Sequence, residues 1–156
     1  MIKFELTSEK TTLKFGAILA PLLKVGGVIY LNGGLGAGKT TLCRGILKAM
    51  GHSGAVKSPT FTLVEPYKVS ELEVYHFDLY RILDPSELEF IGIDEYFGIN
   101  KLCLVEWPEK AAGCLPKHDL EFVIEVLQKK RIIEIRANSH GGEKICTQLK
   151  ELKGLG

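Results

Sequence analysis

The sequence predicts an α/β domain of three layers, in which helices cover a mixed, mostly parallel central sheet. Apolar stretches of strand length alternate with helical patterns along residues 1–156, which favours parallel strands joined by helices. One apolar stretch, residues 28–31, runs directly into a glycine-rich turn and a helix start. Two late stretches, residues 121–127 and 131–136, flank a short polar linker that is typical of an antiparallel hairpin. We therefore expect one domain with a few antiparallel strands added to a parallel centre.

The other expected elements follow the chain in order. Residues 2–6 form a short strand, and a helix begins at residues 7–9, where Ser or Thr serves as the cap, and ends near Leu23. We expect this helix to bury Leu13, Ala17, Ile18 and Ala20. A second helix, from Lys39 to the stop signal Gly51, should bury Leu42, Ile46, Ala49 and Met50. Later in the chain we expect strands at residues 72–80 and 101–108, the second of which Pro108 ends. We also expect a helix start at 84–89, a short helical or turn region at 91–97, and a modest helical pattern from residue 141.

The glycine-rich turn carries a phosphate-binding motif. Gly33, Gly38, Lys39 and Thr40 fit the pattern G-x-x-x-x-G-K-S/T, which defines the phosphate loop of P-loop NTPases. Glycines let backbone N–H groups approach an anion, and the helix that follows directs its free N–H groups to the same place. Lys39 adds a positive charge for the outer phosphates, and the Thr40 hydroxyl is a ligand for Mg²⁺. The fold class is therefore a P-loop NTPase-like domain that binds ATP with Mg²⁺.

Two acids stand near the ends of apolar strands, where ligands of open α/β sheets bind. Glu106 follows the apolar residues 102–105, as a Walker B acid does, and Asp78 lies near the end of the preceding strand. Either acid could complete the Mg²⁺ shell or orient the attacking water, and the sequence leaves this choice open. His76, two residues before Asp78, either touches the site or is a hydrogen-bonded structural histidine. Trp107 either packs at the nucleotide site or contacts a partner, or it is an ordinary core or edge aromatic.

The Ser-Pro-Thr turn at residues 58–60 leads towards a further strand through Phe61, Leu63 and Val64. Proline restricts its own φ and that of the residue before it, so the turn is constrained. It is either an ordinary loop-to-strand junction or a switch segment in which Thr60 senses the γ-phosphate or Mg²⁺.

The bulk composition excludes several classes of protein. The formal net charge of the chain is +1, which argues against a protein that holds a nucleic-acid backbone by electrostatics. The four cysteines form no C-x-x-C pair, so a zinc or dithiol redox site is not indicated. No apolar run reaches membrane-spanning length, and the N-terminus lacks the apolar core of a signal peptide. We expect a soluble, cytoplasmic protein without membrane contact.

Several motifs, in this order, make the chain resemble the TsaE (YjeE) family of bacterial P-loop ATPases. They are Leu35–Thr41, Ser58–Phe61, His76–Arg81, Glu87–Glu89 with Gly92, and Val105–Pro108. The resemblance implies ATP binding and hydrolysis in the machinery that forms N6-threonylcarbamoyladenosine in tRNAs reading codons that begin with A. It also implies that the partners are the TsaB and TsaD proteins and that tRNA is reached indirectly, through their complex.

The resemblance further implies roles for individual residues. Lys39 holds phosphate, Thr40, Glu106 and Asp78 surround Mg²⁺, and Thr60 lies in the switch-like segment. Trp107 belongs to a functional Glu-Trp pair, and Glu9 or Thr12 lies near the adenine. The remaining nucleotide contacts come from the loop itself, namely Gly33, Gly34, Leu35, Gly36, Ala37, Gly38 and Thr41. Many family members carry an acid where this chain has Gly34, so a side-chain role there is not implied.

Two other functions fit the same motifs. A small-molecule kinase would share the fold, but such kinases usually clamp the phosphoryl group with clustered arginines, and Arg44, Arg81, Arg131 and Arg136 form no cluster in the sequence. A binding module whose nucleotide state gates partner contact is compatible with the ATPase hypothesis. Strong independent binding of tRNA is not expected at this net charge.

Overall fold

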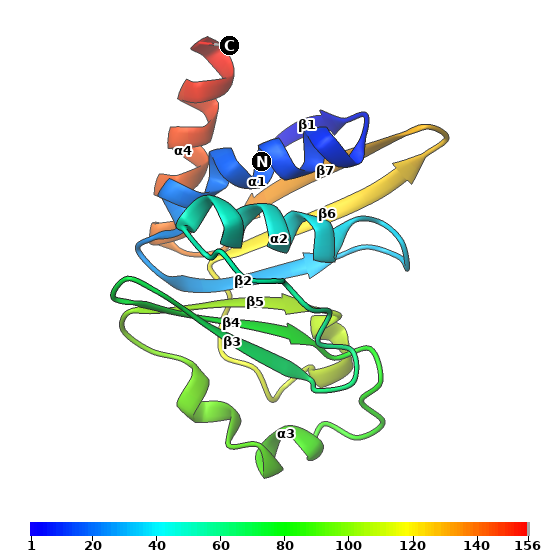
Figure 1. Cartoon of the computed structure of the whole chain (residues 1–156), viewed down its shortest axis with the longest axis vertical. Helices are drawn as coiled ribbons and strands as arrows, with labels where there is room; N and C mark the ends of the chain where they lie inside the picture. The colour runs from blue at the N-terminus through cyan, green and yellow to red at the C-terminus, as the bar shows by residue number, and fades with distance from the viewer. Residues whose placement is uncertain (156) are drawn as a thin grey trace.

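The computed structural model describes residues 1–155, which form a mixed seven-stranded sheet with helices packed against it (Figure 1). The strands are β1 (Ile2–Leu6), β2 (Gly27–Asn32), β3 (Val64–Val69), β4 (Leu72–Asp78), β5 (Lys101–Glu106), β6 (Leu120–Leu127) and β7 (Lys130–Ala137). The helices are α1 (Glu9–Leu23), α2 (Lys39–Met50), α3 (Glu87–Phe90) and α4 (His140–Leu155), with two 3₁₀ turns, η1 (Ile93–Tyr96) and η2 (Pro108–Ala111).

The strand order is β1-β7-β6-β2-β5-β4-β3. The four central strands β6, β2, β5 and β4 are parallel, whereas β1, β7 and β3 join by antiparallel pairing. The mixed sheet and the β6–β7 hairpin are thus confirmed. Because β1 is antiparallel to β7, and β7 to β6, five of the seven strands run in the same direction and only β7 and β3 oppose them, as expected for a mostly parallel sheet.

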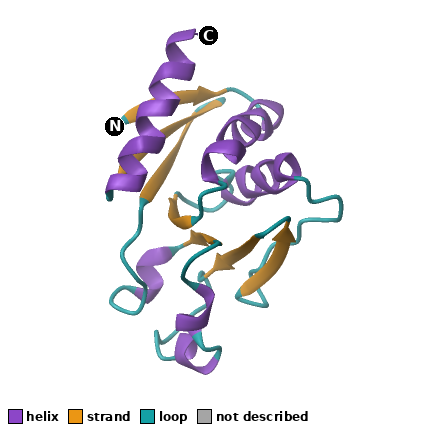
Figure 2. Ribbon diagram, turned by 90° about the vertical axis from the view of Figure 1, so that its left-hand side faces the viewer, coloured by secondary structure: helices purple, strands orange, loops and turns teal. Residues whose placement is uncertain are grey.

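The long helices α1, α2 and α4 share one apolar core with one face of the sheet. In Figure 2 these helices occupy the upper half of the molecule and the short helical turns occupy the lower half. Helices α1 and α2 approach closely because two glycines face each other's backbone. A Cβ atom on Gly16 would lie 2.8 Å from the amide nitrogen of Ile46, and one on Gly45 would lie 2.7 Å from the carbonyl oxygen of Leu13.

The third layer is thin and covers only part of the opposite face. A second apolar core, around Phe77 and Val105, packs β4 and β5 against α3, η1 and η2. On the same face, β1, β6 and β7 carry charged side chains instead, including Lys3, Glu134 and Arg136, which form ion pairs. The predicted three-layer arrangement therefore holds for the β2–β3 side of the sheet, where the candidate site lies.

Two details of the helices differ from the predictions. Helix α1 begins after the cap Ser8, as expected, and Ala20 is buried as predicted, but Leu13 is only half-buried and Ala17 and Ile18 are exposed. The buried residues are Thr12, Phe15, Gly16, Leu19, Ala20 and Leu23. This segment is apolar on nearly every side, so its periodicity does not select a face, and the close contact at Gly16 does. On α2, Ala49 is exposed, while Leu42, Ile46 and Met50 are buried as predicted.

None of the helices in residues 1–155 is both long enough and apolar enough to span a membrane.

Candidate functional site

The phosphate loop lies between β2, which ends at Asn32, and α2, which begins at Lys39. The loop turns through left-handed backbone conformations at Gly36 (φ 75°) and Gly38 (φ 103°), which residues with a side chain rarely adopt. Gly38 is the N-cap of α2 and no side chain caps this helix end. The N–H groups of its first turn are therefore free to bind an anion.

The two strand-end acids lie side by side. Asp78 and Glu106 are register partners at the ends of the parallel strands β4 and β5. Both side chains belong to the face of the sheet that packs against α2, because they alternate in step with the buried Val74 and Leu104. The expectation that parallel strands bring these acids together next to the phosphate loop is therefore confirmed.

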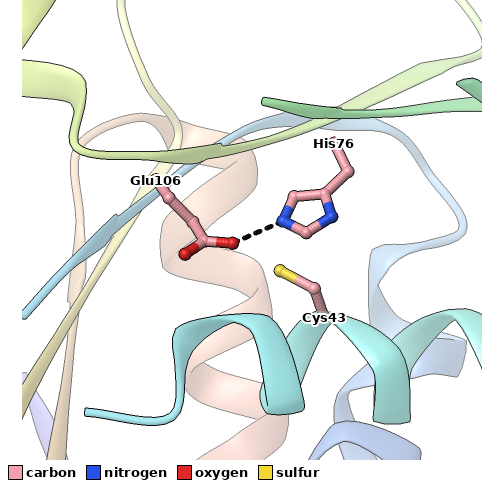
Figure 3. A group of neighbouring side chains, drawn as sticks. All are labelled: Cys43, His76 and Glu106. Carbon is pink, nitrogen blue, oxygen red and sulfur yellow. Dashed lines mark hydrogen bonds and ion pairs between the residues drawn. The ribbon is translucent and has the colours of Figure 1, made fainter. Parts of the chain in front are cut away.

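Glu106 is buried, with 2% of its surface exposed, and accepts hydrogen bonds from two elements. The Thr40 hydroxyl on α2 lies 3.0 and 3.3 Å from its two carboxylate oxygens. His76 on β4 is fully buried, and its Nε2 lies 2.5 Å from Glu106 Oε2 (Figure 3). Of the two interpretations of His76, the structure thus gives a hydrogen-bonded histidine that touches the site through Glu106.

Cys43 completes the surroundings of this pair (Figure 3). One ligand-type atom from each of Cys43, His76 and Glu106 lies within 4.8 Å of the others, and all three residues are buried. Burial raises the pKa of the Cys43 thiol well above its ordinary value, and the charge of Glu106 adds to the effect. Cys43 is therefore a neutral thiol beside the carboxylate.

Asp78 holds the Ser-Pro-Thr turn against the site. The Thr60 hydroxyl donates to Asp78 Oδ2 over 3.0 Å, and Ser58 Oγ lies 2.7 Å from Thr60 Oγ1. The amide of Tyr80 donates to the other carboxylate oxygen of Asp78. The predicted switch segment thus contacts one of the two acids directly. The strand expected after this turn begins at Val64, whereas Phe61 is exposed.

Lys39 lies between the loop and Trp107. Its Nζ atom is 2.5 Å from the carbonyl oxygen of Gly33 and 3.7 Å from the centroid of the Trp107 ring. Burial lowers the pKa of Lys39, while the nearby charges of Glu106 and Asp78 oppose that effect. Trp107 follows β5 in a left-handed conformation (φ 58°), which turns the chain sharply at the strand end and sets its ring against Lys39.

These groups line one cleft of about 320 Å³. Its lining includes most of the residues predicted for the site, namely Glu9, Thr12, Leu35, Gly36, Ala37, Gly38, Lys39, Thr40, Thr41, Thr60, Asp78, Glu106 and Trp107. Gly33 and Gly34 are not part of the lining. Two lining residues, Ser58 and Arg131, were not predicted as site residues. Ser58 belongs to the predicted Ser-Pro-Thr turn, which was a signal for it. No local pattern distinguishes Arg131 from the other charged residues on its strand.

The oxygen donors of the cleft suit Mg²⁺, which prefers hydroxyl, carboxylate and water ligands. The Thr40 hydroxyl already lies within hydrogen-bond distance of Glu106, and Asp78 stands next to Glu106 on the neighbouring strand. These residues could therefore share one hard cation next to phosphates bound in the loop.

Comparison with known proteins gives matches along most of the chain. The family model "Threonylcarbamoyl adenosine biosynthesis protein TsaE" matches residues 6–133. The tRNA threonylcarbamoyladenosine biosynthesis protein TsaE of Haemophilus influenzae is 47% identical over 144 residues, which cover 89% of this chain and 91% of that protein. The protein of the same name from Bacillus subtilis is 36% identical over 149 residues, covering 95% and 93%. Among solved structures, that of Bacillus subtilis YdiB superposes with a TM-score of 0.82 at 32% identity, covering 97% and 95% of the two chains.

Proposed function

Because this chain belongs to the TsaE family of threonylcarbamoyl adenosine biosynthesis proteins, we propose that it binds and hydrolyses ATP with Mg²⁺ and acts together with the TsaB–TsaD pair. The observation that carries the proposal is the cleft in which the phosphate loop meets two strand-end acids, Asp78 and Glu106. Hydrolysis of ATP needs placement and charge neutralisation more than covalent chemistry from the protein.

The residues of the cleft have different roles in this proposal. The backbone N–H groups of residues 36–41 and the Lys39 ammonium group bind the phosphates of ATP. Thr40, Glu106 and Asp78 would hold Mg²⁺, which when bound neutralises charge on the outer phosphates. Lys39 would leave the Gly33 carbonyl to reach the terminal phosphates, and its position on the Trp107 ring sets it beside them.

Water is the phosphoryl acceptor in this proposal. One of the two acids orients it, and separate substitutions Asp78→Asn and Glu106→Gln identify which one. Loss of the acid that orients water should lower the turnover number kcat even at saturating Mg²⁺. Loss of an acid that only binds the metal should lower activity in a way that high Mg²⁺ partly restores. Thr60, which donates to Asp78, links the state of the nucleotide to the position of the Ser-Pro-Thr turn.

The test is Mg²⁺-dependent ATP hydrolysis by the purified chain, alone and with the TsaB–TsaD pair. We expect Lys39→Ala to lower kcat/KM at least about a hundredfold, because it removes the charge that the loop directs at the phosphates. Glu106→Ala should have an effect of similar size. The matched control is Lys48→Ala, which removes an exposed lysine at the far end of the same helix.

The proposal would be overturned if the wild-type protein, assayed with its partners, hydrolysed ATP no faster than Lys39→Ala. Partner dependence has its own readout: affinity for the TsaB–TsaD pair is measured with ATP, with ADP and without nucleotide. Equal affinities in all three states would remove the link between nucleotide and partner.

A further inference from the structure

Arg131 reaches the phosphate loop from a distant part of the chain. It stands at the start of β7, just after the hairpin turn, and its Nη2 atom donates to the carbonyl oxygen of Gly36 over 2.9 Å. A Cβ atom on Gly38 would lie 3.6 Å from Arg131 Nε. The side chain therefore lies against the middle of the loop, and it also lines the cleft.

The sheet fixes this position firmly. Arg131 pairs with Leu6 on β1 and with Val126 on β6, so its backbone has a strand on each side. Its side chain alternates in step with the buried Ile133 and Ile135 and so leaves the sheet on the face that packs against α1 and α2. The guanidinium group is thus held beside the loop by the sheet and by Gly36.

One donor of this guanidinium group lacks an acceptor. Arg131 Nε is buried and forms no hydrogen bond within residues 1–155. Arg136 on the same strand behaves differently, because its Nε and Nη1 atoms pair with Glu134 and Glu121. Burial of a cationic donor without an acceptor is unfavourable, so the arrangement at Arg131 suits an anion that arrives from outside the chain.

The charges of the cleft point to the same kind of ligand. Its lining contains three acids, Glu9, Asp78 and Glu106, and two cations, Lys39 and Arg131. Lys39 has Asp78 and Glu106 as close charge partners. Among the described residues the Arg131 side chain forms one hydrogen bond, to a backbone carbonyl, and no ion pair, so its charge is available to the phosphates of a nucleotide.

We propose that Arg131 is a nucleotide-binding residue that supports the phosphate loop through Gly36 and donates to a phosphate oxygen of the bound nucleotide. The inference rests on the proposed ATP binding and adds a specific contact to it. Since Arg131 lies at the middle of the loop, whose N–H groups cradle the α- and β-phosphates, its contact is with a phosphate that ADP shares with ATP. Arg131 therefore contributes to affinity for both nucleotides and not to transfer of the γ-phosphoryl group.

The experiment is calorimetric titration of the full chain with Mg-ADP and with Mg-ATP. We expect Arg131→Ala to raise the dissociation constant for both nucleotides by at least about tenfold, the effect of losing a hydrogen bond to a charged group. Arg131→Lys keeps the charge but lacks the planar fork, so it should recover only part of the affinity. The matched control Arg136→Ala, on the same strand but outside the cleft, should bind within about twofold of the wild type.

Hydrolysis separates nucleotide binding from other roles. In Arg131→Lys, KM for ATP should rise while kcat stays within about threefold of the wild type, because only ground-state binding is lost. Wild-type affinity for ADP in Arg131→Ala or in Arg131→Lys would overturn the inference, as would a lowered kcat at unchanged KM. If Lys39→Ala loses affinity and Arg131→Ala does not, only this inference fails. A wild-type chain that binds neither nucleotide would instead refute the proposed function.

Discussion

Replacement of His76 tests whether the buried histidine positions the acid that we assign to Mg²⁺. His76 and Glu106 have side chains that are 0% and 3% exposed, and the two are joined by a hydrogen bond of 2.5 Å. His76→Leu fills a similar volume but removes the donor. The Glu106 carboxylate then keeps only the Thr40 hydroxyl as a partner.

Two effects of His76→Leu follow from this geometry. A buried carboxylate that loses one of its partners destabilises the fold by about 1–3 kcal/mol. For a domain of this size, each kcal/mol lowers the melting temperature Tm by about 2–4 °C. Loss of a residue that orients a metal ligand typically lowers metal affinity or activity by about 10–100-fold.

The assay is ATP hydrolysis as a function of Mg²⁺ concentration, with thermal unfolding measured on the same samples. We expect His76→Leu to raise the Mg²⁺ concentration for half-maximal activity, and His76→Gln, whose amide can replace the Nε2 donor, to restore most of it. If His76→Leu lowered Tm but kept the wild-type Mg²⁺ dependence, His76 would be a structural residue and the positioning argument would be refuted.

Three further predictions concern other parts of the molecule. Gly45→Ala places a Cβ atom 2.7 Å from a carbonyl oxygen of α1, so urea unfolding should show a loss of about 1–3 kcal/mol, whereas Gly154→Ala, in open space on α4, should show none. Burial raises the pKa of the Cys103 thiol from 9.0 to about 12. As pH rises from 9 towards 12, the unfolded chain loses this proton while the folded chain keeps it, so the free energy of unfolding should fall by up to about 1.4 kcal/mol per pH unit. The same pH series on Cys103→Ala should lack this contribution. Thr60→Val removes the hydrogen bond to Asp78 and should lower kcat by about tenfold, whereas Thr60→Ser should retain it; equal kcat in both variants would contradict a role for this hydroxyl.

The parts of the site that the sequence could predict depend on local patterns and one general rule. The phosphate loop is read from neighbouring residues, because a strand, a glycine turn and a helix start follow each other within residues 28–41. Asp78 and Glu106 are far apart in the chain, but parallel strands end at the same edge of a sheet. That rule alone predicts that the two acids lie close together.

Other features depend on contacts that no local pattern encodes. Arg131 reaches Gly36 only because β7 pairs with β6 and β6 pairs with β2. The sequence predicts the hairpin but not the place of the hairpin in the sheet. The buried face of α1 is a second case: the helix is apolar on most sides, and the contact of Gly16 with α2 selects the face.

The strand order also has a consequence for synthesis of the chain. Strand β2, which carries the phosphate loop, has β5 and β6 as its neighbours, and both are made long after it. A ribosome that adds about 5–20 residues per second needs several seconds to pass from residue 32 to residue 127. The apolar residues 28–31 lack both strand partners until β5 has been made and lack the second until β6 follows, so during this time only the early α1–α2 contact can help to cover them. The proposed nucleotide site includes Glu106 at the end of β5 and Arg131 on β7, so any stabilisation of the fold by nucleotide would come late in synthesis.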